Sequence, residues 1–259
     1  MQKQEKILVV IDPSRDEQPA LERAITNAQI REAEEQSHLV LLVTAGRSVG
    51  TRNLAWINQL QQSVESEGID SELIVSWSQE WSANILNTAN ELHADMVMLP
   101  LYDQQTGNQL ISDEKWALLR KCESPILLVR PGGKPKRKSI LVSVKMQDGS
   151  YDDLNQRILE RGSWAAWRYG AELHVVNAYS DSMNFPDRGK INNMVKIEND
   201  NIHIQQGEPG KVISEVAEKV DADMILVGTK RRSGIKAALR GNTIEKIVGS
   251  LSQDVMLMI

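Results

Sequence analysis

Ala94–Pro100 reads ADMVMLP and Ala222–Gly228 reads ADMILVG, two closely similar stretches that lie 128 residues apart. Each continues from an Ala-Asp pair into an apolar run, a pattern typical of a strand buried on both faces of a parallel sheet. A repeat at this distance predicts two tandem copies of one fold rather than a single large domain. After the repeated stretch the copies diverge, because Leu101 follows in one and Thr229 in the other.

Other predicted strands repeat as well. Three further pairs of segments match: Ile7–Ile11 with Ile140–Val144, Val40–Ala45 with Leu173–Ala178, and Pro125–Val129 with Asp254–Met258. Between the copies, residues 131–138 (PGGKPKRK) mix chain breakers with charge, which predicts a solvated linker. We therefore expect two domains, at residues 1–133 and 138–259.

Segments with helical period alternate with these apolar runs. The pattern is clear around Ala24 in the first copy and around Val216 in the second. Each copy is therefore predicted to be an α/β domain, doubly wound in three layers, with a five-stranded parallel sheet of order 3-2-1-4-5. In such a sheet, ligands bind at the carboxyl ends of the strands where the winding reverses, between strands one and four.

Composition excludes several classes of function. The net charge of −5 argues against a nucleic-acid partner, and no apolar run is long enough to cross a membrane. The chain starts without a signal-like segment, so we expect a cytoplasmic protein. Cys122 is the only cysteine, which excludes an internal disulfide.

The second copy carries the candidate binding loop. Lys145 follows its first strand, and Gly228 and Thr229 end its fourth. Gly241-Asn242-Thr243 opens the last helix, where free backbone N–H groups and the positive end of the helix dipole suit an anion. Further basic residues would deepen the positive potential here: Lys230, Arg232, Lys236 and Arg240.

The spacing in this loop resembles the universal stress protein family. Gly228 is followed after two residues by Arg231, and after nine more by Gly241-Asn242. In the family this loop holds ATP phosphates, with a glycine at the position of Arg231. Gly207-Glu208-Pro209 is also similar to the family's turn after strand three. The likeness covers nearly the whole chain as two copies and is strongest to the tandem E-type members.

The resemblance implies an adenine nucleotide alpha hydrolase-like fold and a stress-response binding module. It implies that ATP or another phosphorylated ligand is bound in the second copy, by residues at these positions: Lys145, Gly228, Thr229, Arg231, Gly241, Asn242 and Thr243.

Both copies depart from the family pattern. The family's aspartate after strand one contacts the adenosine moiety; the first copy keeps it as Asp12, whereas the second has Lys145. The first copy has Pro100 in place of Gly228 and lacks the phosphate loop. The side chain of Arg231 either blocks the approach of a phosphate to the backbone or itself binds the phosphate with paired donors.

Two alternative functions stay open. Trp56, Trp77 and Trp81 of the first copy form either ordinary core or a pocket for a hydrophobic ligand, as in a carrier or sensor without nucleotide. A weak ATP hydrolase of the same superfamily is the other alternative. No nucleophile triad or metal spacing is present, and His174 and His203 have no third ligand in the sequence pattern. The sequence thus favours a binding protein without a metal over an enzyme.

The last strand of each copy is apolar and would be exposed at a sheet edge. Single-domain members of the resembled family associate through this strand. A tandem chain is therefore expected to pack its halves as an intramolecular pseudo-dimer. Unidentified protein partners and further association into a homodimer are compatible with the sequence.

Overall fold

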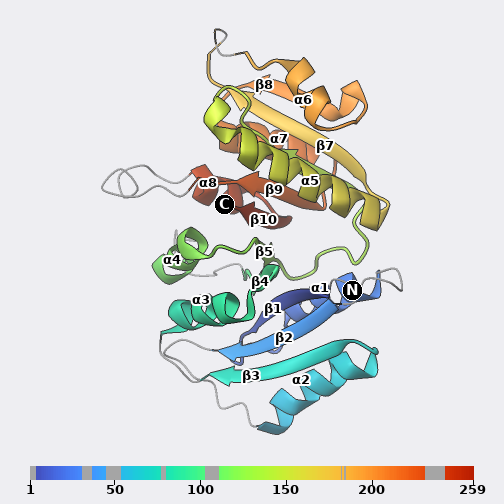
Figure 1. The fold of residues 1–259 in the computed structure, drawn as a ribbon, viewed down its shortest axis with the longest axis vertical. Coiled ribbons are helices and arrows are strands. Elements are labelled where there is room, and N and C mark those ends of the chain that lie inside the picture. Colours follow the sequence, from blue (N-terminus) through green and yellow to red (C-terminus); the bar gives the residue numbers. More distant parts are fainter. Residues whose placement is uncertain are drawn as a thin grey trace. The chain divides into compact units, whose positions relative to one another are not determined.

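The computed structural model describes residues 4–30, 37–44, 54–76, 80–102, 111–181, 183, 185–230 and 243–259. The chain divides into two compact units, Met1–Pro135 and Lys136–Ile259 (Figure 1). Among the described residues, no helix combines the length and apolarity that a membrane span requires.

The first unit alternates strands and helices from its start to its end. Its elements are β1 (Glu5–Ile11), α1 (Pro19–Gln29), β2 (Ser37–Thr44), α2 (Leu54–Ser66), β3 (Asp70–Ser76), α3 (Trp81–Leu92), β4 (Met96–Pro100), α4 (Asp113–Lys121) and β5 (Ile126–Val129). The strands are parallel and lie in the order β3-β2-β1-β4-β5.

The second unit repeats this plan. Its elements are β6 (Ser139–Ser143), a 3₁₀ turn (Gly149–Tyr151), α5 (Asp152–Tyr169), β7 (Glu172–Tyr179), α6 (Arg188–Met194), a second 3₁₀ turn (Asn199–Asn201), β8 (Ile202–Gln206), α7 (Pro209–Lys219), β9 (Met224–Gly228), α8 (Thr243–Ser250) and β10 (Asp254–Met258). The parallel strands lie in the order β8-β7-β6-β9-β10. Counted along each unit, both orders are 3-2-1-4-5, so the predicted fold class is confirmed.

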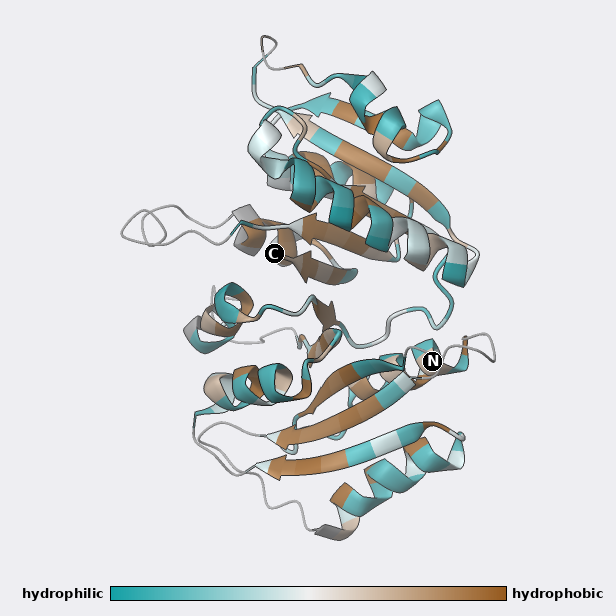
Figure 2. Ribbon diagram, in the orientation of Figure 1, coloured by the Kyte–Doolittle hydropathy of each residue, from teal (hydrophilic) through white to brown (hydrophobic). Residues whose placement is uncertain are grey.

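Helices cover both faces of each sheet. Right-handed crossovers place α5 and α6 on one face of the second unit and α7 and α8 on the other. Figure 1 shows α5 and α7 on opposite sides of β7, and both helices pack against that strand. Residues of the central strands, such as Val9 and Val142, are fully buried. Figure 2 shows β1 and β9 as mostly brown ribbons, whereas α5 and α2 carry mostly hydrophilic residues.

The repeated Ala-Asp pair has the same structural role in both units. The Asp95 carboxylate accepts a hydrogen bond from the backbone N–H of Lys6 at 3.0 Å, at the start of β1. The Asp223 carboxylate likewise accepts from the N–H groups of Lys138 and Ser139, at 2.6 and 3.2 Å, at the start of β6. Each aspartate thus holds the first residues of the central strand beside strand four, which explains why the pair occurs twice.

The turn before each repeated strand is also the same. His93 follows α3 with φ of 49°, and Asp221 follows α7 with φ of 44°. A left-handed residue at this position ends a helix by turning the chain away from its axis. The duplication is therefore visible in backbone conformation as well as in sequence.

Candidate functional site

The candidate site lies at the carboxyl edge of the second unit, between β6 and β9. These strands are adjacent and parallel, with Ser143 opposite Val227. The loop after β6 carries Lys145, and Thr229 and Lys230 follow β9. The winding of the sheet reverses between these two strands, so this is the edge at which sheets of this order bind ligands.

Two lysines meet on one aromatic ring at this edge. The Nζ atom of Lys145 lies 4.4 Å from the ring centroid of Tyr151, and that of Lys230 lies 4.3 Å from the same centroid. Each contact is a cation–π interaction worth about 0.5–1 kcal/mol at an exposed site. Two positive charges therefore converge beside Tyr151, although their lysines are 85 residues apart in the sequence.

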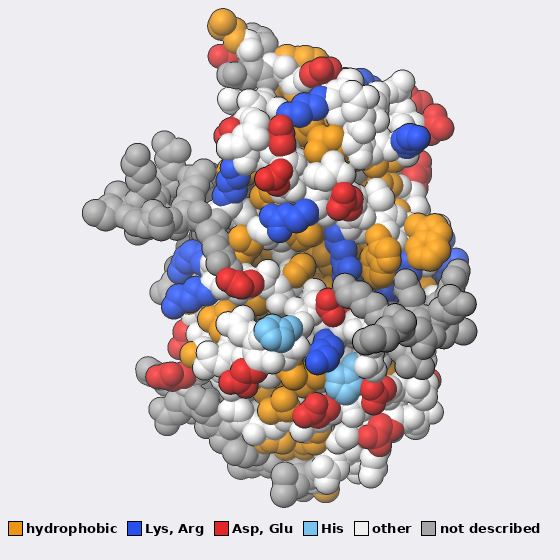
Figure 3. Space-filling model, in the orientation of Figure 1, with side chains coloured by type: hydrophobic (Ala, Val, Ile, Leu, Met, Phe, Trp, Pro, Cys, Tyr) orange, Lys and Arg blue, Asp and Glu red, His pale blue; other side chains and the backbone are white. Residues whose placement is uncertain are grey.

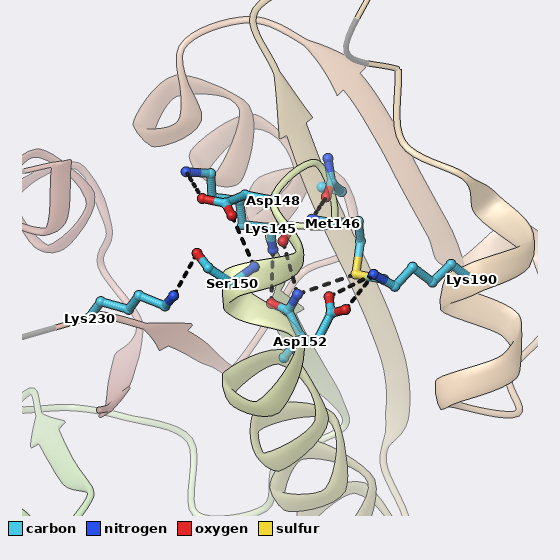
Figure 4. Close-up of polar contacts among 9 residues, drawn as sticks. Lys145, Met146, Asp148, Ser150, Asp152, Lys190 and Lys230 are labelled. Atoms are coloured by element: carbon cyan, nitrogen blue, oxygen red, sulfur yellow. Dashed lines mark hydrogen bonds and ion pairs between the residues drawn. The ribbon is translucent and has the colours of Figure 1, made fainter.

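Polar side chains of the loop hold the two ammonium groups (Figure 4). Lys230 Nζ donates to Ser150 Oγ at 2.7 Å, and Lys145 Nζ lies 3.8 Å from Asp148 Oδ2. Hydrogen bonds from Ser150 hold the pKa of the Asp148 carboxyl below its usual range, and the charges of Lys145 and Lys230 add to this effect. The edge thus brings together Lys145, Lys230 and the Asp148 carboxylate, which stays ionised at neutral pH.

The backbone of the loop is tied to the elements on either side of it. Lys145 N–H donates to Asn155 Oδ1 at 3.0 Å, and Asn155 Nδ2 donates back to the carbonyl of Lys145 at 2.9 Å. Met146 N–H donates to Asn177 Oδ1 at 2.8 Å, and Gln147 Nε2 donates to a β7 carbonyl at 2.8 Å. α5 and β7 therefore fix the position from which Lys145 projects.

A third lysine near the site is already paired. Lys190 Nζ of α6 donates to both carboxylate oxygens of Asp152, at 2.6 and 2.8 Å (Figure 4). Asp152 is the first residue of α5, where the positive end of the helix dipole also stabilises a negative charge. This ion pair links α6 to the start of α5 and leaves Lys145 and Lys230 as the cations that face Tyr151.

Gly228 has a packing role that the sequence analysis missed. A Cβ atom at this position would lie 2.3 Å from Ile158 Cδ1 and 3.0 Å from Leu154 Cγ. Both side chains belong to α5, so the glycine lets this helix lie close to the end of β9. The N–H of Thr229 is also in use, since it donates to the carbonyl of Met258 at 2.8 Å.

The structure brings part of the predicted site together. Lys145, Gly228 and Thr229 share the expected edge, and Thr243 is the first residue of α8. Arg231, Gly241 and Asn242 lie outside the described residues. The sequence analysis counted Lys230 only among the basic residues around the loop. In the structure its ammonium group contacts Ser150 and Tyr151 directly. Tyr151, Asn155 and Asn177 were not predicted. For Asn155 and Asn177, the signal available in the sequence was an asparagine among apolar residues. Both side chains are almost completely buried in the structure.

The same edge of the first unit carries a different set of residues. Asp12 accepts hydrogen bonds from Ser14 N–H at 2.9 Å and from Ser14 Oγ at 2.6 Å. Lys115 Nζ of α4 lies 3.4 Å from the carbonyl of Pro100. Burial lowers the pKa of Lys115, and the charge of Asp12 offsets part of this shift. Burial also raises the pKa of Tyr102 above its usual range.

Other candidates from the sequence can be placed as follows. Trp56 and Trp81 are half-buried on α2 and α3, and Trp77 lies outside the described residues. His203 Nε2 lies 3.4 Å from His174 Nδ1 across neighbouring strands. Within the described ranges, no three His, Cys, Asp or Glu side chains are placed to hold a metal ion. On the face drawn in Figure 3, basic and acidic side chains are interspersed.

Comparison with known proteins shows the family. The Universal stress protein family matches residues 4–130 and 193–258. Universal stress protein E of Photorhabdus laumondii is 26% identical, with 97% of this chain and 94% of that protein covered. Universal stress protein E of Escherichia coli K12 is 25% identical, with 98% and 93% covered. The crystal structure of a Pseudomonas aeruginosa UCBPP-PA14 protein assigned to the same family superposes with a TM-score of 0.82 at 26% identity, covering 99% and 94% of the two chains.

The chain belongs to the universal stress protein family, and its likeness to the tandem E-type members extends over nearly its full length. The resemblance predicted from the sequence is confirmed. In the second unit, the matched residues 193–258 include β9 and β10, whereas Lys145 and Tyr151 lie before them.

Proposed function

We propose that this chain is a stress-response binding protein whose second unit binds ATP or another phosphorylated ligand. The observation that carries the proposal is the convergence of Lys145 and Lys230 on Tyr151, at the edge between strands one and four. Ammonium groups bind phosphate oxygens through charge-assisted hydrogen bonds. The family membership supports the same edge, because its phosphate loop follows strand four.

We propose binding rather than hydrolysis because the Asp148 carboxylate has a lowered pKa. A general base works best when its pKa lies near the operating pH. Hydrogen bonds from Ser150 hold the pKa of Asp148 below the ordinary range of a carboxyl group, which makes it a poor proton acceptor at neutral pH. The carboxylate instead serves to place the ammonium group of Lys145.

The test is calorimetric titration of the full chain with ATP. Replacing both site lysines, Lys145→Met and Lys230→Met, removes two cations and should weaken ATP binding by about tenfold or more. The matched control is Lys211→Met, which removes an exposed lysine of α7 that pairs with Glu215 in the same helix. The control should bind ATP like the unmodified protein.

Two results would contradict the proposal. One is the absence of heat with ATP and with a panel of other phosphorylated metabolites. The other is unchanged affinity in the double lysine variant. Thermal unfolding of each variant shows whether a loss of binding comes from the site or from the fold.

A further inference from the structure

At the edge of the second unit, some polar groups are already hydrogen-bonded within the protein, whereas others can still bind a ligand. We infer that this site recognises the oligophosphate part of its ligand and does not read a nucleobase, so that ATP, GTP and inorganic tripolyphosphate bind alike. This inference rests on the proposed phosphate binding and narrows it to a class of ligand.

The groups that can take up an anion are the two ammonium groups. Lys145 is exposed and Lys230 is half-buried. Among the described residues, the carboxylate nearest the Lys145 ammonium group is that of Asp148, at 3.8 Å, and Lys230 donates one of its three N–H bonds to Ser150. Donors therefore remain on both ammonium groups for phosphate oxygens. Both lie within 4.4 Å of one ring centroid, so a single short polyanion can reach both.

The backbone groups that would read a base after β6 are committed elsewhere. A base edge is recognised by N–H donors and carbonyl acceptors at matched positions. Here Asn155 takes both the N–H and the carbonyl of Lys145, and Asn177 takes the N–H of Met146. The two asparagines are 1% and 0% exposed, so their amide groups are not available to a ligand either.

On the strand-four side of the edge the structure describes residues up to Lys230, and one backbone donor there is already in use. The N–H of Thr229 is bonded to the carbonyl of Met258. Tyr151 is the described aromatic ring beside the lysines, and two ammonium groups already lie over it. A base stacked on a face that an ammonium group covers would displace that group, at the cost of its cation–π contact.

Electrostatics favours a polyanion for a further reason. Two ammonium groups beside one ring repel each other, and the single carboxylate of Asp148 offsets only part of this repulsion. A chain of phosphates that bridges both lysines relieves the repulsion. An uncharged nucleoside does not.

The experiment compares four probes on the full chain by calorimetry at one ionic strength: ATP, GTP, inorganic tripolyphosphate and adenosine. Each titration is run with EDTA and again with Mg²⁺, because the metal competes for phosphate oxygens. We expect dissociation constants for the first three within about threefold of one another, and no heat with adenosine. The Lys145→Met, Lys230→Met double variant should weaken all three by the same factor, about tenfold or more, and Lys211→Met should weaken none.

The outcomes separate this inference from the proposed function. Binding of adenosine, or ATP binding about tenfold tighter than both GTP and tripolyphosphate, would show that the base is read. The inference would then be wrong while the proposed phosphate binding stands. If none of the three phosphorylated probes binds, both are wrong.

Discussion

The two units share one strand order but end their central strands differently. Asp12 follows β1, near the partly buried Lys115, whereas Lys145 follows β6 and shares the Tyr151 ring with Lys230. The topology therefore decides where a ligand edge lies, and the side chains that reach the edge decide its charge. One duplicated fold presents an aspartate near Arg15 and Lys115 in one unit and two lysines on one tyrosine ring in the other.

The opposite edge of the sheet has changed less. Asp95 and Asp223 hold the starts of β1 and β6 through the same kind of hydrogen bond. The difference between the two edges is physical. The first N–H groups of a strand need hydrogen-bond partners in any sequence, and these two carboxylates supply them. At the carboxyl edge of the second unit, Lys145 and Asp148 reach solvent, so a charge of either sign is accommodated there.

The largest expected effect concerns a buried ion pair of the second unit. Arg137 is 1% exposed, and its guanidinium donates to Asp254 at 2.7 Å and to the hydroxyl of Tyr169 at 3.1 Å. Asp254→Ala leaves this buried charge without its carboxylate, which should lower the free energy of unfolding by about 3–5 kcal/mol. Urea denaturation measures the loss, and amide hydrogen exchange should show reduced protection in β6 and β10.

The first unit supplies the matched comparison. Arg23 is also buried, and its guanidinium donates to the backbone carbonyls of Lys134 at 2.7 Å and Pro135 at 3.0 Å. Arg23→Met removes the charge together with these bonds and should cost less, about 2 kcal/mol. A cost above that of Asp254→Ala would overturn this distinction between the two buried arginines.

The next effect is a dependence of stability on pH. Burial lowers the pKa of His174, and burial together with the charge of His174 lowers the pKa of His203 to about 4. The other charges that act on the pair are those of Glu172, Lys219 and Arg188.

The unfolded chain takes up protons at a pKa near 6.5, and the folded pair does so only in more acid solution. Stability contributed by neutral histidines is therefore present above pH 6.5 and lost as the pH falls from there toward 4.

His203→Gln should remove about 2 kcal/mol of the stability loss that accompanies acidification from pH 7 to pH 5. Urea denaturation at both pH values measures the difference between the variant and the unmodified protein. Because groups remote from the pair titrate equally in both proteins, the difference reports His203 together with its effect on His174. An equal or steeper loss in the variant would show that the pair does not resist protonation.

The smallest effect tests how closely α5 lies on its sheet. A Cβ atom at Gly162 would lie 2.3 Å from Val142 Cγ2, in the middle of β6. Overpacking costs about 1–3 kcal/mol, and the higher helix propensity of alanine returns up to about 1, so Gly162→Ala should destabilise by about 1 kcal/mol. The control is Gly149→Ala, where the nearest atom is the Oδ2 of Asp152 at 3.7 Å. Thermal unfolding should give a lower melting temperature for Gly162→Ala than for Gly149→Ala. The reverse order would show that α5 does not lie this close to β6.

Much of the fold was predictable from the sequence, and the site only in part. Strands that are buried in a parallel sheet appear in the sequence as continuous apolar runs, such as Met224–Val227. Such a run can be recognised without knowing which residues contact it in the fold. Gly228 was placed at the correct edge, but its contact with Ile158 depends on how α5 crosses β9. That crossing joins residues far apart in the chain, so local patterns carry no signal for it.

The sequence by itself determined the duplication, the order of strands and the edge at which Lys145 lies. Periodicity and repeated segments are local properties, and the handedness of crossovers leaves few ways to connect them. Only the tertiary structure decided that Lys145 and Lys230 meet on Tyr151 and that Asn155 and Asn177 take the backbone groups of the loop. Such contacts arise where separate elements pack, and their geometry depends on the whole unit rather than on any segment of it.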